Sequence, residues 1–316
     1  AVEKSQAATE NPKQNTKFGT WMKYGQALMD AYNSPSGNVW AGMSRQEYNV
    51  VAGNEKPVSE TAVEVGGQKM TKLTFANKNL YFNQAGALSI IEVTQPVVEN
   101  ALDKAVEAYS QAIKLDDKGQ KTADFKKVLG TIAGHYSEEA YNDYSFGKPA
   151  DASVLFEKAA NTAAMAPLSQ IDTNSIYNAG YTAWQASEND RAKEFLLKSI
   201  KYGYAGTDGD AYAKLGDLEQ KAGNKEAGKN YLEEGFVKYP QSQSILVGLI
   251  NFYVNGGENT DRIFELLSIA KKNEPTNASL YYVEGNIREK LGQEAEAVAA
   301  YNKCSEINPS YEYGYV

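Results

Sequence analysis

The sequence predicts an all-α protein in which about six helical hairpins stack into a solenoid, with a small β-rich insertion in the first hairpin. Three observations predict this fold class. Small residues recur along the chain at a fixed spacing, glycine-containing turns separate paired amphipathic segments, and residues 33–96 alternate as strands do. A single helical hairpin cannot bury its own apolar face, so neighbouring hairpins must stack.

The spacing of small residues is clearest near the end of the chain. From Gly285 it is twelve residues to Ala297, four more to Tyr301, three more to Cys304 and five more to Pro309. Matching ladders begin earlier at Ala140, Gly180, Gly216 and Asn251. Successive starts are therefore 40, 36, 35 and 34 residues apart, and a period near 34 is typical of helical repeats.

Each ladder position has a physical role in a helical hairpin. Gly285 and Ala297 are small where the two helices of one unit approach each other, and Tyr301 and Cys304 are expected to face the neighbouring unit. Pro309 ends the second helix, because proline cannot continue it. The segments "KLGQEAEA", "KAGNKEAG" and "SFGKPADA" are the predicted turns, with glycine closing the first helix.

The start of the chain carries half of a further repeat. The segment "TWMKYGQALMDAY" places an aromatic, a glycine and apolar residues at Trp21, Tyr24, Gly25 and Leu28. Its second half arrives late, as Ala105, Tyr109 and Ala112. In this pattern the chain resembles the tetratricopeptide repeat (TPR) family, whose repeat reads W-x2-L-G-x2-Y, then A-x3-F, A and P. The resemblance implies a right-handed solenoid with an insertion that splits the first repeat.

The predicted organisation follows from these units. We expect a flexible polar tail at 1–17, a split first repeat at 18–32 plus 97–118, the insertion at 33–96 and the TPR array at 119–316. Within the insertion, "ETAVEVGGQKMTKLTF" and "NLYFNQAGALSIIEV" read as two β-hairpins, and "MSRQEYNVVAG" as a short helix. The insertion either covers the exposed N-terminal end of the stack or binds a partner.

Composition excludes several classes of function. With a net charge of −8 and a pI of about 5.0, the chain has no basic stripe for phosphates, so we expect no nucleic-acid partner. No apolar stretch approaches the roughly 20 residues that cross a bilayer. The single cysteine, Cys304, rules out an internal disulfide, and the single histidine, His135, rules out multi-histidine metal sites.

The sequence also lacks the motifs of the common catalytic sites. It has no P-loop, no G-x-G-x-x-G after a strand, no G-x-S-x-G and no H-E-x-x-H, so we predict no enzyme, cofactor or metal site. We interpret "TDGDAYAKLGD" as a helix N-cap, and His135 and Cys304 as structural residues. The adjacent pairs Glu138-Glu139 and Glu233-Glu234 are expected to be solvated. An enzymatic role would rest on the insertion alone.

The TPR resemblance indicates where a ligand would bind. In TPR arrays the first helix of each repeat lines the concave groove. Carried onto this chain, the groove candidates are Tyr141, Tyr144, Tyr177, Tyr181, Trp184, Asp217, Phe252 and Tyr282. Rigid aromatic side chains give large contact area at little entropy cost. The alternative is that these tyrosines only cover contacts between repeats. At the groove positions where other TPR domains carry basic residues that clamp acidic chaperone tails, this chain has no lysine, which argues against that ligand.

These inferences lead to a hypothesis about function. We predict a non-catalytic scaffold that binds a peptide or protein segment in the concave groove. The alternative is a carbohydrate-binding accessory protein of the cell envelope that uses the same aromatics. The segment "SQSILVGLINFYVNGGENTDRIFELLSIAKKNEPTNASLYYVEGNI" is similar to envelope-associated TPR proteins of Bacteroides-type bacteria, which implies a periplasmic, envelope or secreted location. A cytoplasmic location, the oligomeric state and the partner's identity stay open.

Overall fold

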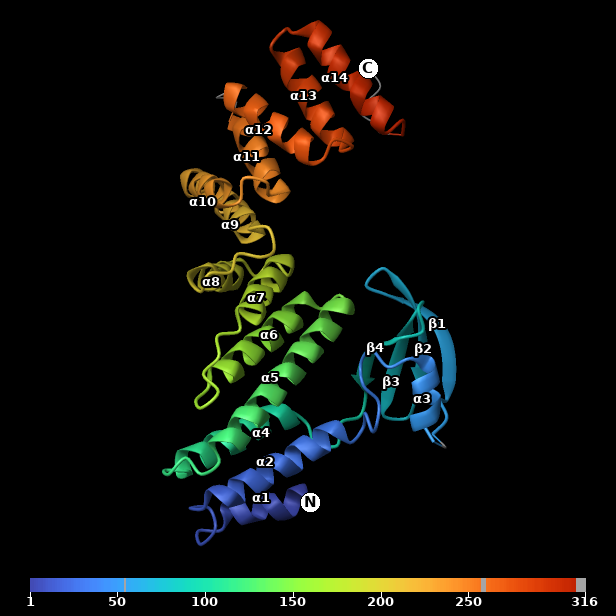
Figure 1. The fold of residues 1–316 in the computed structure, drawn as a ribbon, viewed down its shortest axis with the longest axis vertical. Helices are drawn as coiled ribbons and strands as arrows, with labels where there is room; N and C mark the ends of the chain where they lie inside the picture. The colour runs from blue at the N-terminus through green and yellow to red at the C-terminus, as the bar shows by residue number, and fades with distance from the viewer. Residues whose placement is uncertain (54, 257–259, 311–316) are drawn as a thin grey trace. The chain divides into compact units, whose positions relative to one another are not determined.

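The computed structural model describes residues 1–53, 55–256 and 260–310, which form fourteen α-helices and one four-stranded antiparallel sheet (Figure 1). The chain divides into two compact units, Ala1–Glu188 (unit 1) and Asn189–Val316 (unit 2). The mostly helical architecture with a small sheet is the one that the sequence predicts. The predicted end of the array, residues 311–316, lies outside the described residues.

The first seventeen residues differ from the prediction. In place of a flexible tail, Val2–Glu10 form helix α1, which packs along α2 (Phe18–Asn33). Val2 lies against the core of unit 1, and the Trp21 indole donates a hydrogen bond to the carbonyl oxygen of Asn15 over 2.8 Å. The polar composition concealed this helix, because few of its side chains are buried.

Helix α2 pairs with α4 (Ala101–Leu115), although the insertion separates them in the chain (Figure 1). Gly25 permits the close contact, since a Cβ there would lie 2.7 Å from Cε2 of the Tyr109 ring. Tyr109 is buried in a core that also contains Leu28, Leu102 and Phe125. That α2 and α4 form a single interrupted TPR repeat stays a prediction.

The insertion forms a sheet of strand order β1-β2-β3-β4. The strands are β1 (Ser59–Val65), β2 (Gln68–Thr74), β3 (Lys78–Asn83) and β4 (Leu88–Val93). The first hairpin turns at Gly66 and Gly67, which have φ of 57° and 75°, and the second turns at Gly86 with φ of 78°. Helix α3 (Arg45–Val51) starts at a capping box of Ser44 and Glu47. Both predicted hairpins and the short helix are confirmed.

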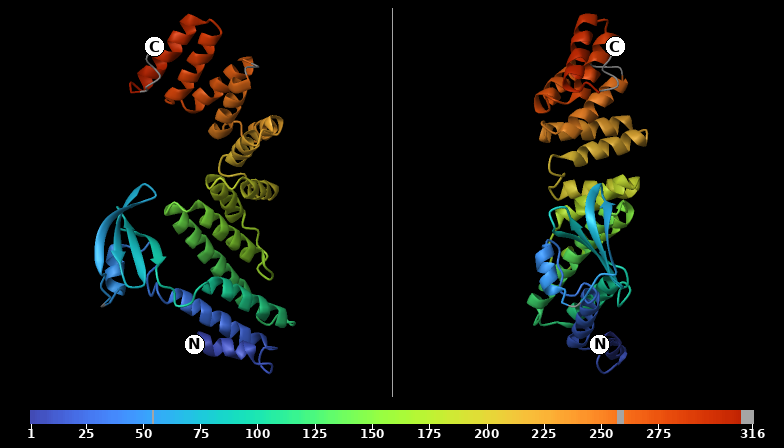
Figure 2. Two further views of the ribbon diagram at one scale, coloured as in Figure 1. Left: turned by 180° about the vertical axis from the view of Figure 1, so that it is seen from behind. Right: turned by 90° about the vertical axis from the view of Figure 1, so that its right-hand side faces the viewer.

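One face of the sheet packs on α3, and the other meets the end of α5 (Thr122–Ser145) (Figures 1 and 2). Tyr81 lies edge-to-face on Phe146 at 5.4 Å, and the Asn142 amide donates to the carbonyl oxygen of Ile91 over 3.3 Å. The insertion therefore packs beside the second hairpin. Helix α1 is the element that packs along α2 at the start of the chain, and whether the insertion covers the end of the stack or binds a partner stays a prediction.

Helices α5, α6 (Pro149–Ala164) and α7 (Thr173–Gln185) complete unit 1. The predicted turn after α5 is confirmed: Gly147 has φ of 74°, and Pro149 is the first residue of α6. The buried Ser153 hydroxyl donates to the carbonyl oxygen of Ala179 over 2.7 Å, which ties α6 to α7. Helix α6 thus packs on both α5 and α7.

Unit 2 consists of helix α8 followed by three hairpins. Its helices are α8 (Asn189–Lys201), α9 (Asp210–Lys221), α10 (Lys225–Lys238), α11 (Gln243–Gly256), α12 (Thr260–Asn273), α13 (Ala278–Lys290) and α14 (Glu294–Ile307). The small ladder residues meet inside the hairpins, as predicted. A Cβ on Gly228 would lie 2.9 Å from the carbonyl oxygen of Gly216. The segment "TDGDAYAKLGD" contains the start of α9, as predicted, with Gly209 as the N-cap residue and no side-chain cap hydrogen bond.

Tyr301 corrects another expectation. A Cβ on Gly285 would lie 2.5 Å from Cε1 of Tyr301, whose hydroxyl is 2.7 Å from both Asn286 Oδ1 and Glu289 Oε2. Tyr301 therefore packs against the partner helix of its own hairpin and not against a neighbouring unit. Cys304 is fully buried, as a structural residue should be.

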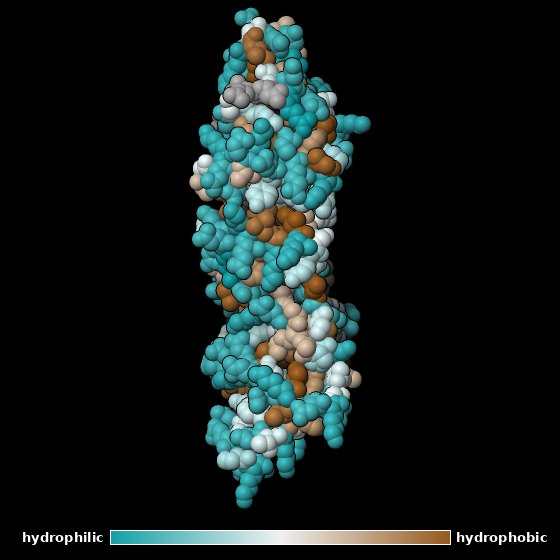
Figure 3. Space-filling view, turned by 90° about the vertical axis from the view of Figure 1, so that its left-hand side faces the viewer, coloured by the Kyte–Doolittle hydropathy of each residue, from teal (hydrophilic) through white to brown (hydrophobic). Residues whose placement is uncertain are grey.

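Most of the surface drawn in Figure 3 is hydrophilic. On the face in Figure 3, hydrophobic residues lie in separate patches among hydrophilic ones. None of the described helices is both long and apolar enough to cross a membrane.

Candidate functional site

Four of the predicted groove residues form one cluster on α5 and α7. The ring centroids of Tyr177 and Tyr181 are 6.0 Å apart, those of Tyr144 and Tyr181 6.3 Å, and those of Tyr181 and Trp184 6.4 Å. Each ring is partly exposed. We call these four residues the aromatic cluster. Because Tyr177, Tyr181 and Trp184 follow at helical spacing on one face of α7, only Tyr144 reaches the cluster from another helix.

Tyr141 precedes Tyr144 on α5 and is exposed, with 54% of its surface accessible. Its ring meets Phe156 edge-to-face at 5.0 Å, and its hydroxyl accepts a hydrogen bond from the Asn178 amide over 3.0 Å. A phenol that accepts from an amide keeps its own proton for donation. Tyr141 therefore offers a fixed ring and a hydroxyl donor to a ligand.

A hollow of about 450 Å³ lies along α5, one to three turns before Tyr141. It is lined by Gly130, Gly134 and Ser137 of α5, and by the loop that leads into α7. The Ser137 and Ser175 hydroxyls are 3.3 Å apart and join α5 to α7 at its edge. A Cβ on either glycine would touch nothing within 4 Å, so the glycines leave open space along this part of α5.

The other three candidates belong to unit 2. Asp217 on α9 pairs with Lys221 at 2.8 Å, Phe252 on α11 packs edge-to-face on Tyr253 at 5.6 Å, and Tyr282 on α13 lies 5.9 Å from Tyr301. Each of them makes a contact within its own element or hairpin. The structure thus brings together the unit 1 candidates, and in unit 2 it places the candidates on three separate helices.

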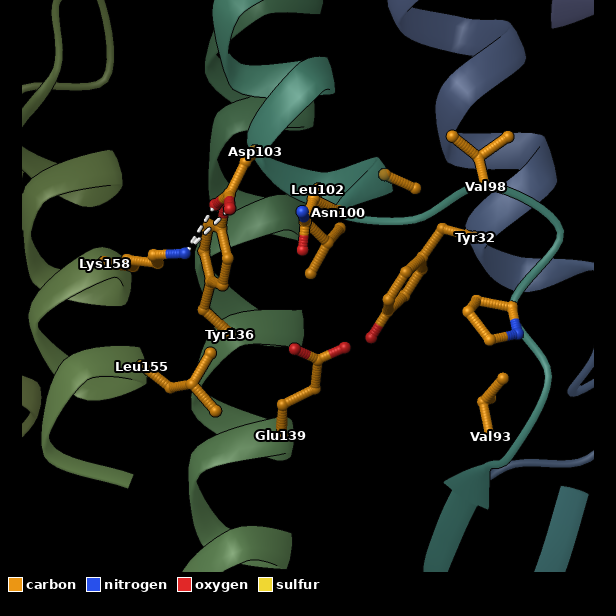
Figure 4. Close-up of a pocket in the computed structure, with 12 residues that line it drawn as sticks. Tyr32, Val93, Val98, Asn100, Leu102, Asp103, Tyr136, Glu139, Leu155 and Lys158 are labelled. Atoms are coloured by element: carbon orange, nitrogen blue, oxygen red, sulfur yellow. Dashed lines mark hydrogen bonds and ion pairs between the residues drawn. The ribbon is translucent and has the colours of Figure 1, made fainter. Parts of the chain in front are cut away.

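Sequence reasoning missed a polar cavity of about 260 Å³ where α2, α4, α5 and α6 meet (Figure 4). Asp103 accepts hydrogen bonds from the Tyr136 hydroxyl at 2.5 Å and from Lys158 at 2.8 and 2.9 Å. Burial raises the pKa of Asp103, but these bonds outweigh it, so the pKa lies below its ordinary 3.8. The residues come from three helices, and no local spacing could reveal them.

Glu139 lines the same cavity, with its carboxylate facing the Tyr32 hydroxyl (Figure 4). Burial raises its pKa above the ordinary 4.5, and Asp143 and Asp103 add to the rise, although Tyr32 and His135 oppose it. The expectation that Glu138 and Glu139 are equally solvated is wrong for Glu139. Across the described residues, no three histidine, cysteine or acidic side chains gather as a metal site.

This environment predicts a pH-dependent effect of Glu139→Gln. The folded protein disfavours the ionised form of Glu139, and this lowers the free energy of unfolding. The loss is absent below pH 4.5, and it develops as the pH rises from 4.5 through the raised pKa of the folded state. Glu139→Gln should therefore raise the free energy of unfolding at pH 7 and change it little at pH 4. Urea unfolding at both pH values measures this. Glu138→Gln is the control, because that side chain is 67% exposed; equal gains at the two pH values would contradict the assignment.

Comparison with known proteins identifies the class of repeat. Residues 278–311, which include α13 and α14, match the family model of the tetratricopeptide repeat. The hairpin in which Gly285 contacts Tyr301 is therefore similar to a TPR unit.

The chain is also similar to part of the multifunctional-autoprocessing repeats-in-toxin of Vibrio cholerae serotype O1 (strain ATCC 39315 / El Tor Inaba N16961). The identity is 27% over 153 residues, which are 44% of this chain and only 3% of that protein.

Three solved structures show a similar arrangement of the chain. PilF of Pseudomonas aeruginosa has 12% identity and a TM-score of 0.48, covering 67% of this chain and 87% of that one. The MamA protein has 20% identity and a TM-score of 0.47, covering 60% and 98%. YrrB, described as a TPR protein with an unusual peptide-binding site, has 18% identity and a TM-score of 0.44, covering 57% and 88%.

Proposed function

We propose that this protein is a non-catalytic scaffold that binds an extended protein segment across the aromatic cluster and Tyr141. The TPR match supports a scaffold, because stacked helical hairpins present extended surfaces for partners. The observation that carries the proposal is the group of adjoining, partly exposed rings on α5 and α7. Aromatic side chains of this kind supply most of the binding energy at protein interfaces.

The surroundings of the cluster also suit a peptide. The Tyr141 hydroxyl can donate to a main-chain carbonyl, and the hollow beside Gly130 and Gly134 has room for a side chain. A carbohydrate is the alternative ligand. It is less favoured because Tyr177 and Tyr181 stack on each other with their planes 30° apart, which covers part of one face of each ring. Sugar binding by stacking needs open ring faces.

A peptide-display experiment tests the proposal. A phage library of random 12-residue peptides is selected on the full chain, and dissociation constants of the selected peptides are measured. Tyr181→Ala combined with Trp184→Ala should weaken binding by about 100-fold or more, because two hot-spot aromatics are lost. Tyr202→Ala is the matched control, since Tyr202 is an exposed tyrosine outside the cluster.

The possible outcomes separate the hypotheses. Selected peptides that bind the double variant as well as the wild type would sink the peptide-binding proposal. Reproducible hits on a glycan array that vanish in the same double variant would favour the carbohydrate alternative. Unchanged circular dichroism melting of the double variant is required in either case. A periplasmic or envelope location remains a second proposal, which fractionation of the source cells would test.

A further inference from the structure

A groove of about 620 Å³ lies between the insertion and the helices of unit 1. Its walls are the end of α2, the loop 36–41, strand β4 and helix α5. We call this space the insertion groove. It adjoins the cavity in Figure 4, because Tyr32, Val93, Glu139 and Leu155 line both. The insertion thus forms one wall of a site whose other wall is a repeat helix.

The lining of the insertion groove is strongly acidic. Four carboxylates face it, against a single lysine, at Glu92, Glu138, Glu139, Asp143 and Lys148. A cleft lined by one sign of charge focuses the field and raises the local concentration of counter-ions. The groove is therefore electrostatically complementary to a cation.

The groove's lysine compensates little of this charge. Lys148 lies 3.5 Å from Asp143, and its side chain is 55% exposed. His135 Nδ1 lies 3.1 Å from Glu138. Glu92 is held in place by hydrogen bonds from the Tyr81 hydroxyl at 2.6 Å and the Asn79 amide at 2.7 Å. These neutral donors fix the Glu92 carboxylate without cancelling its charge.

Exposed aromatic rings lie on the two walls of the groove. Trp40, in the loop of the insertion, is 50% exposed, and Tyr141 on α5 is 54% exposed. Tryptophan and tyrosine faces attract lysine and arginine side chains through their ring quadrupoles. A half-exposed tryptophan beside four carboxylates is suited to an aliphatic stem with a positive head.

We propose that the insertion groove receives a lysine or arginine side chain of the protein segment that binds the aromatic cluster, so that the insertion selects basic partners. The inference rests on the proposed function, since Tyr141 belongs both to the groove and to the surface beside the cluster. The segment runs from the aromatic cluster past Tyr141, and its basic residue enters between Trp40 and the carboxylates. This assigns the insertion a direct role in recognition.

The same 12-residue peptide library provides the test. Peptides selected on the wild-type chain should be enriched in lysine and arginine. Their affinity should fall about tenfold or more in Glu138→Gln combined with Glu139→Gln, and also in Trp40→Ala, because a charge-assisted contact is lost. The control is Glu294→Gln combined with Glu296→Gln, which removes two exposed carboxylates from the first turn of α14 and changes the net charge equally.

Each outcome decides the question. Loss of affinity in the groove variants but not in the α14 control supports the proposal. Peptides without basic enrichment that need Tyr181 and Trp184 but tolerate the groove variants would overturn it and leave the scaffold function standing. Equal losses of affinity in the groove and α14 variants would mean that only the net charge of the protein matters, and this result would also overturn the proposal. Failure to select any peptide would overturn the scaffold function and this inference together.

Discussion

Replacement of Tyr109 by alanine is expected to lower the free energy of unfolding by about 3–5 kcal/mol. Tyr109 is buried, and its ring fills the space that Gly25 leaves on α2. The contact joins two helices that the whole insertion separates in the chain. Loss of the ring therefore leaves a cavity between α2 and α4. Among the described glycines of unit 1, Gly25 is the only one that makes a close contact between these two helices.

Urea unfolding of the full chain, followed by circular dichroism, measures this effect. Tyr109→Phe is the matched control and should cost less than about 1 kcal/mol, because the ring stays in place. Hydrogen exchange should show the loss of protection concentrated in α2 and α4.

A double-mutant cycle with Gly25→Ala sharpens this prediction. In the wild type, the added Cβ would lie 2.7 Å from the Tyr109 ring, and this overpacking is destabilising. It opposes the stabilisation that alanine gives because it favours the helix more than glycine does. With Tyr109→Ala, that clash disappears, and Gly25→Ala should stabilise the protein by about 1 kcal/mol. An unchanged effect of Gly25→Ala in the two backgrounds would show that α2 and α4 do not meet at this contact.

The parts of the fold that the sequence predicts correctly depend on local sterics. Gly66 and Gly67 must adopt positive φ to turn the first hairpin, and Gly223 and Gly292 do the same after α9 and α13. The ladder glycines are visible because a helix pair can approach closely only where side chains are absent. The adjoining rings of α7 follow in the same way from helical spacing.

The missed features depend on contacts between distant parts of the chain. Helix α1 buries too little apolar surface to produce a periodic hydrophobic pattern in the sequence. The sheet packs on α5 through residues far apart in the chain, and local secondary-structure propensity does not predict such contacts. Carboxylates illustrate the same limit. Glu233 looks solvated beside Glu234, yet it accepts hydrogen bonds from Tyr253 at 2.8 Å and from Arg262 at 3.1 Å. Its partners lie on the following hairpin and only folding brings them near.

The candidate site divides along the same line. The aromatic residues of α5 and α7 could be chosen from repeat register, because each repeat places equivalent positions on one surface. The insertion groove could not, since Trp40 and Glu92 line it together with α5 only because the sheet packs there. The composition predicts a negative net charge, but it does not predict that acidic side chains gather between the insertion and α5.

Two glycines of unit 2 give the second large effect that we expect. Gly209 and Gly223 have nearly equal φ, 81° and 84°, so alanine at either position is strained. Only Gly209 has a neighbour in the way, because a Cβ there would collide with the Tyr239 ring, whereas nothing lies within 4 Å of one on Gly223. Gly209→Ala should lower the free energy of unfolding by about 3 kcal/mol, and Gly223→Ala by about 1 kcal/mol.

Urea unfolding of the full chain again provides the measurement, with hydrogen exchange of α9 and α10 to locate the loss. The difference between the two variants isolates the Tyr239 contact, because the backbone strain is common to both. In a Tyr239→Ala background, Gly209→Ala should cost only the strain of about 1 kcal/mol. Equal losses for Gly209→Ala and Gly223→Ala in the wild-type background would mean that the Tyr239 ring moves aside without cost. The close packing of α9 on the end of α10 would then not limit the residue at position 209.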